Sequence, residues 1–113
     1  MELLGKYRLL KLKKKNKGNA KLNRAIDELI KEIINSNWNS KIELQKERKD
    51  ADLVHNDGFF FFDINIHRTM ILILFDDNQA NIIWTGTHDE YERTFKNNKK
   101  VIETWLRNKG LIK

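Results

Sequence analysis

The apolar residues follow two different spacings along this chain, and the difference limits the folds that it can adopt. Between residues 22 and 33 they recur every three or four positions, which is the period of a helix with one buried face. After Gly58 they form short continuous runs, Phe59–Phe62 and Met70–Phe75, bounded by turn residues. Such runs are typical of strands that are covered on both faces. The chain therefore predicts an α+β fold with helices packed on a sheet.

The first 36 residues are expected to form two helices. The basic segment Lys6–Asn16 carries leucines among its lysines, and Gly18 can end this helix because glycine adopts the left-handed conformation freely. Asn19 can cap a second helix. The apolar stripe of that second helix consists of Leu22, Ile26, Leu29, Ile30 and Ile33. Residues 36–40 interrupt the stripe and predict a loop.

The second half of the chain supplies the strands. A third apolar run begins at Ile82, after the turn residues Asp76–Gln79, so three consecutive strands with short turns predict an antiparallel meander. Thr87 and Glu90 have the spacing of a capping box, which predicts a helix that begins after Thr87. A last apolar stripe, before Gly110, predicts a C-terminal helix. It is formed by Val101, Ile102, Trp105 and Leu106.

These elements predict one small domain that spans residues 1–113. Two N-terminal helices would pack on a three- to four-stranded antiparallel sheet, and a C-terminal helix would follow it. The short segment Glu2–Leu4 is the candidate for the fourth strand. The phenylalanines Phe59–Phe62 resemble a base-stacking platform, but neighbouring residues of a strand face opposite sides, so a place in the core is the better interpretation.

The composition excludes several kinds of site. The chain has no Cys, and its glycines form no phosphate-binding loop, so thiol catalysis and the common nucleotide motifs are excluded. The three histidines lack metal-ligand spacing, and we expect neither a metal nor another cofactor. The longest apolar run, Met70–Phe75, is too short for a membrane helix, and the lysine-rich start has no apolar signal segment. We expect a cytoplasmic protein that has no contact with membranes.

The charges are distributed unevenly. Residues 1–24 carry nine basic side chains and one acidic one, residues 93–113 carry seven and one, and residues 51–92 carry one and eight. Basic ends around an acidic middle favour a polyanion held from two sides, although lysines that merely solubilise surface helices explain the same pattern. The candidate contacts to an RNA backbone are Lys11, Lys13, Lys14, Lys15, Lys17, Lys96, Lys99 and Lys100.

Arg68 is the only Lys or Arg between Lys49 and Arg93, and it lies at the start of a strand that otherwise looks buried. An isolated arginine in such a place usually has a specific anionic partner. Two kinds of partner fit the sequence: an anionic substrate, or a nearby acid such as Asp63.

His88 and Tyr91 follow the third strand at a spacing of three, so a helical turn brings both rings to one face. Histidine is suited to proton transfer near neutral pH, and arginine can stabilise negative charge on phosphorus. Arg68, His88 and Tyr91 are therefore a plausible set for RNA cleavage, in which a 2′-OH attacks the adjacent phosphate. A capping turn with a buried tyrosine explains the same spacing without catalysis.

Two parts of the chain, residues 67–72 and 84–91, resemble the HigB family of toxins in the RelE superfamily. That family shows a strand with F-N-I, a next strand that opens with Y-R, and then a G-T-H-x-E-Y-D motif. The counterparts are Phe62-Asp63-Ile64, His67-Arg68 and Gly86 to Tyr91. Upstream, Trp38-Asn39-Ser40 resembles the family's W-x-S, and Ala51 to Val54 resembles its A-D-x-V. The resemblance covers residues 20–93, and residues 96–113 lie beyond it.

This resemblance implies a RelE-like fold, with a small twisted antiparallel sheet and two N-terminal helices on one side. It implies a toxin of a type II toxin–antitoxin pair, which cleaves mRNA on the ribosome and so inhibits translation. The implied partners are the ribosome, its mRNA and a HigA-like helix-turn-helix antitoxin. The resemblance further implies that Arg68 clamps the scissile phosphate, that His88 moves a proton, and that Tyr91 positions the nucleotide or assists the proton step.

Some positions depart from the family pattern. Glu92 stands where the motif usually has Asp, and His67 stands where an aromatic or polar residue is expected. Two other functions stay open: a ParE-like toxin that blocks a topoisomerase through a protein interface, and a basic RNA-binding module without catalysis. The pair of His88 and Tyr91 argues against the first alternative, because an interface inhibitor needs no residue for proton transfer.

Overall fold

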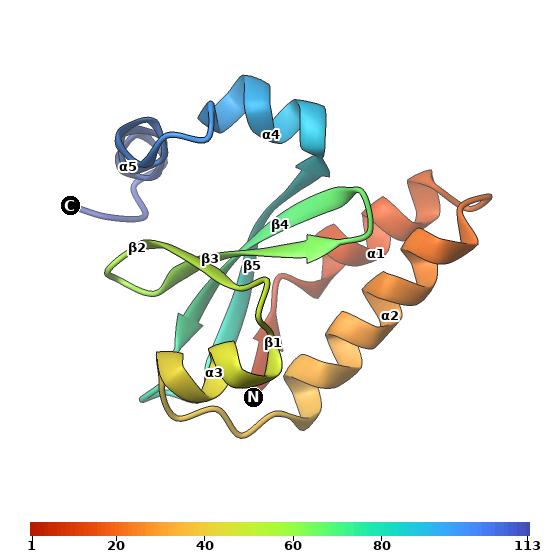
Figure 1. The fold of residues 1–113 in the computed structure, drawn as a ribbon, viewed down its shortest axis with the longest axis horizontal. Helices are drawn as coiled ribbons and strands as arrows, with labels where there is room; N and C mark the ends of the chain where they lie inside the picture. Colours follow the sequence, from red (N-terminus) through yellow and green to blue (C-terminus); the bar gives the residue numbers. More distant parts are fainter.

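The fold is built around one five-stranded sheet, which a computed structural model describes together with the rest of residues 1–113 (Figure 1). Its strands lie in the order β1-β5-β4-β3-β2. Strands β2 to β5 form an antiparallel meander, and β1 pairs with β5 in the parallel direction. The strands are β1 (Glu2–Leu4), β2 (Asp52–His55), β3 (Phe59–Ile64), β4 (His67–Leu74) and β5 (Gln79–Thr87).

Helices cover both faces of this sheet (Figure 1). Helices α1 (Lys6–Lys15) and α2 (Ala20–Asn35) lie on one face, where their apolar stripes form a core cluster with alternate residues of the strands. Helices α4 (His88–Phe95) and α5 (Lys99–Asn108) form a second cluster on the other face. The short helix α3 (Lys41–Glu47) connects α2 to β2.

The structure confirms the predicted α+β class, the two N-terminal helices on one face and the C-terminal helix. The sheet differs in detail from the expected three to four antiparallel strands, because it has five strands and β1 is parallel to β5. Helix α3 lies directly after the predicted loop and was not expected. The expected helix after Thr87 is present, with a complete capping box.

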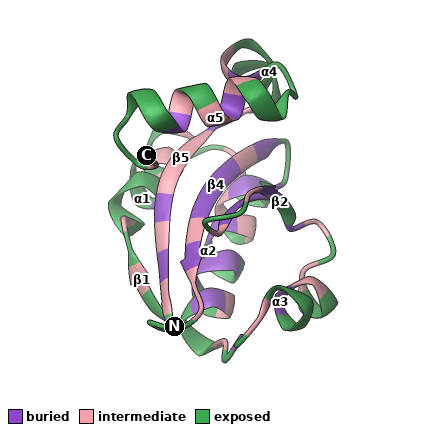
Figure 2. Ribbon diagram, turned by 90° about the vertical axis from the view of Figure 1, so that its left-hand side faces the viewer, coloured by how far each residue is buried: buried purple, intermediate pink, exposed green.

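Successive side chains of β3 point to opposite faces of the sheet and so contribute to different core clusters. Phe60 and Phe62 pack against α1 and α2, whereas Phe59 and Phe61 pack beneath α4 and α5. All four side chains are buried, so the phenylalanine run is core on both faces, as the sequence indicated. Each buried ring contributes about 1.5–3 kcal/mol relative to an exposed one. Figure 2 shows the consequence: the central strand β4 is buried along most of its length, and the outer faces of the helices are exposed.

Arg48 and Asp50, in the segment between α3 and β2, form ion pairs and hydrogen bonds that connect this segment to Asp63 at the end of β3. Arg48 donates two hydrogen bonds to the Asp50 carboxylate, at 2.8 and 2.6 Å, and a third to the Asp63 carbonyl oxygen at 3.0 Å. Asp50 in turn accepts the backbone N–H of Asp63 at 2.8 Å. Burial alone would raise the pKa of Asp50, but the bonds from Arg48 and the Asp63 backbone outweigh it, and the pKa lies below its usual value.

We expect the Asp50→Asn variant to be less stable at pH 7, by about 1 kcal/mol, because Arg48 then loses the nearer of its two carboxylate partners, at 2.6 Å, and keeps only Glu32 at 3.5 Å. A carboxyl whose pKa is depressed by folding stabilises the fold above its unfolded pKa, and this stabilisation disappears as the pH falls through the folded value. The variant should therefore lose less stability than the wild type below about pH 4. Urea denaturation at pH 7, 5 and 3 measures both effects.

Asp76 provides the matched control for this experiment, because it lies exposed in the turn between β4 and β5. Asp76→Asn should leave both the neutral stability and its acid dependence unchanged. An Asp50→Asn protein with a wild-type acid response would show that Asp50 contributes nothing to the acid sensitivity of the fold.

Candidate active site

Arg68 projects from the start of β4 onto the face that α4 and α5 cover. Its guanidinium lies over two rings, 5.0 Å from the centroid of Phe61 and 4.5 Å from that of Tyr91. Its Nε donates to the Asp63 carboxylate at 3.1 Å. The acid partner that the sequence suggested is therefore present. It engages one of the five N–H donors of the guanidinium, and the side chain keeps 15% of its surface exposed. Asp63 and the two rings therefore hold the Arg68 guanidinium in place, and part of its surface remains accessible to solvent.

Tyr91 packs its ring against the Arg68 guanidinium. The residue is 2% exposed, and its hydroxyl donates to the side-chain oxygen of Asn97 at 2.9 Å. Burial raises the pKa of Tyr91, although the nearby charge of Arg68 opposes the shift. The phenol is therefore protonated at neutral pH and already has an acceptor. Tyr91 presents the face of its ring to the Arg68 guanidinium.

His88 is the first residue of α4 and is exposed. Its ring centroid lies 5.9 Å from that of Tyr91, and its backbone N–H donates to the Ile66 carbonyl oxygen at 3.2 Å. His88 and Arg68 line the same shallow depression, of about 340 Å³, at the turn between β3 and β4. The structure thus brings together the three residues that the sequence singled out for catalysis.

The other residues of the G-T-H-x-E-Y segment have structural tasks. Thr87 accepts the backbone N–H of Glu90 at 3.0 Å, and the Glu90 carboxylate accepts the Thr87 N–H at 2.8 Å. The hydrogen bond from the Thr87 backbone lowers the pKa of Glu90. A Cβ atom on Gly86 would stand 2.6 Å from the Trp84 ring, so a larger residue there would displace that ring. These contacts fix the start of α4, and with it the position of His88.

His67 also lines the depression that Arg68 and His88 share, but it makes none of the contacts that hold Arg68. It neighbours Arg68 in β4, so its side chain lies on the opposite face of the sheet, and it is 5% exposed. Its Nδ1 atom is buried without a hydrogen-bond partner. Burial lowers the pKa of His67, although the charge of Glu90 opposes this, and the ring is neutral at pH 7.

The candidate RNA-binding lysines fall into two separate groups. Lys11 and Lys15 line a depression between α1 and β5, and Lys13 forms an ion pair with Asp27 of α2 at 2.7 Å. Lys14 and Lys17 are exposed nearby. The second group, Lys96, Lys99 and Lys100, lies exposed at the connection from α4 to α5. This connection and the turn between α1 and α2 are on opposite sides of the view in Figure 1.

Two further observations concern the chain as a whole. No cluster of three or more His, Cys, Asp or Glu side chains is arranged to hold a metal ion. None of the helices combines the length and the apolar character that a membrane-spanning helix requires.

Sequence reasoning missed two contributors to this site, Phe61 and Asn97. The position of Phe61 could have been inferred, because a two-residue turn between β3 and β4 pairs Asp63 with Arg68, and Phe61 lies two residues before Asp63 on the same face. No signal identifies Asn97, since it acts from a break between helices where its backbone has a positive φ of 47°.

A match to a family model identifies the class of protein, a RelE-like toxic component of a toxin–antitoxin system. A family model with that description, the HigB toxin family, matches residues 22–94, which is more than half of the chain. The chain belongs to the HigB toxin family, and membership of a toxin–antitoxin pair implies an antitoxin as partner. None of the curated proteins compared with the chain matches it.

Proposed function

We propose that this toxin is a ribosome-dependent mRNA endoribonuclease that inhibits translation in the cytoplasm and is neutralised by a HigA-like helix-turn-helix antitoxin. The observation that carries the proposal is the arrangement of Arg68, which is fixed by Asp63 and two aromatic rings and remains open toward the depression that His88 shares. A fixed guanidinium beside an exposed imidazole suits the charge and the proton transfers of phosphodiester cleavage.

The reaction is an attack of a ribose 2′-OH on the adjacent phosphorus. His88 takes the proton from the 2′-OH, and Arg68 stabilises the negative charge that builds up on the phosphate oxygens. The bond from phosphorus to the 5′-oxygen breaks, and that oxygen takes up a proton. The products are a 2′,3′-cyclic phosphate and a free 5′-OH. Tyr91 holds the guanidinium in place for this step.

The basic residues support a large polyanionic partner. The exposed lysines of the two groups can neutralise phosphates of ribosomal RNA or of the message without reading sequence, and such binding weakens steeply with salt. We assign RNA binding to the lysines, and phosphodiester cleavage to Arg68 and His88 with Tyr91 beside them.

Induced expression followed by sequencing of mRNA ends tests the proposal. We expect growth arrest together with new mRNA ends that carry a 2′,3′-cyclic phosphate. Growth arrest accompanied by a DNA-damage response and intact mRNA would instead indicate a ParE-like action on a topoisomerase. RNA binding without new ends, even in the presence of ribosomes, would indicate a module that does not cleave.

The Tyr91→Phe variant separates the ring of Tyr91 from its hydroxyl. We expect mRNA cleavage to stay within about threefold of the wild type, because the ring remains under Arg68 and the proton of the lost hydroxyl was donated to Asn97. Cleavage rates in a translating extract measure this effect. A loss as large as that caused by removing His88 would show that the hydroxyl takes part in the proton transfer.

A further inference from the structure

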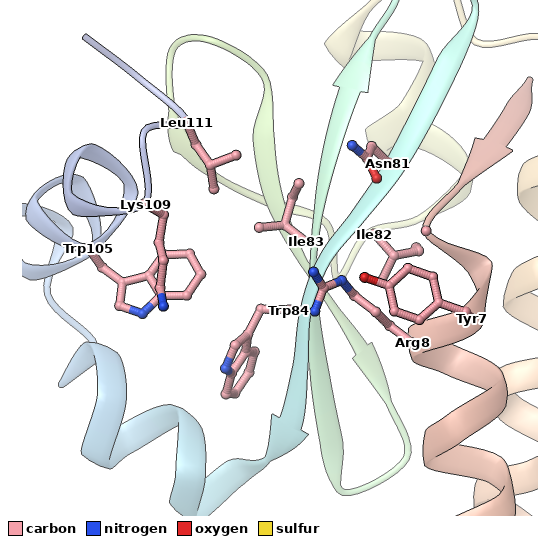
Figure 3. Close-up of a pocket in the computed structure, with 10 residues that line it drawn as sticks. Tyr7, Arg8, Asn81, Ile82, Ile83, Trp84, Trp105, Lys109 and Leu111 are labelled. Carbon is pink, nitrogen blue, oxygen red and sulfur yellow. The ribbon is translucent and has the colours of Figure 1, made fainter.

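A second hollow lies beside β5, away from the depression that Arg68 and His88 share. It has a volume of about 540 Å³ and extends between the start of α1 and the end of α5 (Figure 3). We call it the β5 groove; the residues that matter most to it are Tyr7, Arg8, Trp84, Trp105 and Lys109. Its volume falls within the range that binds small ligands or single units of a polymer.

Each side of the β5 groove carries a cation next to an aromatic ring. On α1, the Arg8 guanidinium lies 5.1 Å from the centroid of the Tyr7 ring. At the end of α5, the Lys109 ammonium lies 5.5 Å from the Trp105 ring. Trp84 lies between the two pairs on β5 (Figure 3). A nucleotide joins a flat base to an anionic phosphate, and each of these pairs offers a surface for both parts.

The charge of the groove favours an anionic ligand. No Asp or Glu lines it, whereas Arg8 and Lys109 do. The adjoining depression shares Tyr7, Arg8 and Trp84, and adds Lys11 and Lys15 with a single carboxylate, Glu90. That carboxylate is already bonded to the Thr87 backbone.

The adjoining depression extends from the groove to the first turn of α4, the helix that begins with His88. The adjoining depression reaches Glu90, two residues beyond His88. Trp84 and Tyr91 both pack edge-on against the same ring, Phe61, at centroid distances of 6.3 and 4.9 Å.

We propose that the β5 groove binds single-stranded RNA, with bases stacked on Tyr7, Trp84 and Trp105 and phosphates paired with Arg8 and Lys109. The inference rests on the proposed function in one respect, that the polymer is RNA. Four of these five residues lie outside the segment that the family model matches, because only Trp84 falls within residues 22–94. The groove is thus a feature of the terminal segments of this chain.

A peptide added to the sheet as a further strand fits the groove less well. Strand β1 pairs with β5 only from Gln79 to Asn81, so the rest of that edge has no strand beside it. However, Tyr7 and Arg8 of α1 line the groove beside this part of β5 (Figure 3), and an added strand would have to lie about 4.8 Å from β5, against these side chains.

The test uses a fluorescently labelled nine-nucleotide single strand with 2′-O-methyl groups, added to the purified full chain without ribosomes. The probe lacks the attacking hydroxyl, so its binding does not depend on cleavage. We expect Tyr7→Ala and Lys109→Ala each to weaken binding about tenfold in fluorescence anisotropy, and Tyr7→Phe to restore it. Lys109→Ala should also lower the salt dependence by about 0.7 in the log–log slope.

Two internal controls accompany these variants. Lys41→Ala removes an exposed lysine at the start of α3 and should leave binding unchanged. Binding should quench the fluorescence of Trp84 and Trp105, and the quenching should shrink in a Trp105→Phe variant. Trp38 is 2% exposed, with its Nε1 bonded to Glu47 at 2.8 Å, and should not respond.

Wild-type affinity and salt dependence in both Tyr7→Ala and Lys109→Ala would overturn the proposal and leave a protein partner as the occupant of the groove. A Tyr7→Phe variant as weak as Tyr7→Ala would also overturn it, because stacking would not explain the loss. Expression that gives no new mRNA ends, together with specific loss of probe binding, would refute the nuclease function and leave the groove standing.

Discussion

Replacement of Arg68 by alanine is expected to abolish growth arrest and to slow mRNA cleavage in a translating extract by about 100- to 1000-fold. Arg68 is the only Lys or Arg that lines the depression with His88, and a group that stabilises charge in a transition state has effects of this size. The fold should survive, because the side chain is partly exposed and its ion pair with Asp63 is a single contact.

Two further variants make the Arg68 result specific. Arg68→Lys keeps the charge but loses the flat guanidinium that lies on Phe61 and Tyr91, so it should recover only a small part of the activity. Arg107→Ala removes an arginine of α5 that is likewise paired with one carboxylate, Glu103, and should cleave like the wild type. A fully toxic Arg68→Ala protein with normal cleavage would place the charge-stabilising group elsewhere.

The helices and the central strands could be predicted because their signals are local. The stripe of α2 and the runs of β3 and β4 each contain their own pattern, and both reappear in the structure. Helix α3 also had a local signal: Ser40 and Glu43 have the same spacing as Thr87 and Glu90, and Ser40 does cap the helix. The parallel pairing of β1 with β5 joins residues that lie 77 positions apart in the sequence, and no local pattern specifies it.

The candidate site likewise has features that a local sequence pattern predicts and features that depend on tertiary contacts. The spacing of His88 and Tyr91 predicted that their rings share a face, and the rings do lie close together. That one ring is exposed and the other buried depends on how α4 packs on Phe61, a tertiary contact that the spacing cannot specify. The β5 groove could not be predicted from the sequence at all, because it depends on how distant segments are brought together. Its two sides come from α1 and α5, and only the sheet between them brings these helices to one edge.

Replacement of Phe61 by alanine is expected to cost about 3–5 kcal/mol of folding free energy, the largest effect of any single change considered for this fold. Phe61 is fully buried and packs edge-on against Tyr91, Phe95 and Trp84, so the lost ring leaves a cavity among three others. Chemical denaturation at pH 7 measures the loss. Because domains of this size are stabilised by roughly 5–15 kcal/mol, much of the variant could be unfolded at growth temperature.

A milder pair of variants separates the effect on the site from the effect on stability. Phe61→Leu and Phe60→Leu remove the same atoms from neighbouring positions of β3, and each should cost about 1–2 kcal/mol. Phe60 faces α1 and α2, where it contacts Phe62 and Phe75, so its replacement leaves the Arg68 side untouched. We expect cleavage to fall about tenfold in Phe61→Leu and to stay near the wild-type rate in Phe60→Leu.

The comparison between the two leucine variants decides what holds the guanidinium. If Phe61 positions Arg68, the two variants lose similar amounts of folding free energy, but only Phe61→Leu loses cleavage activity. Equal cleavage in the two variants would mean that Asp63 and the Tyr91 ring suffice to fix Arg68. In that case a change at Asp63, such as Asp63→Asn, must produce the loss that Phe61→Leu does not.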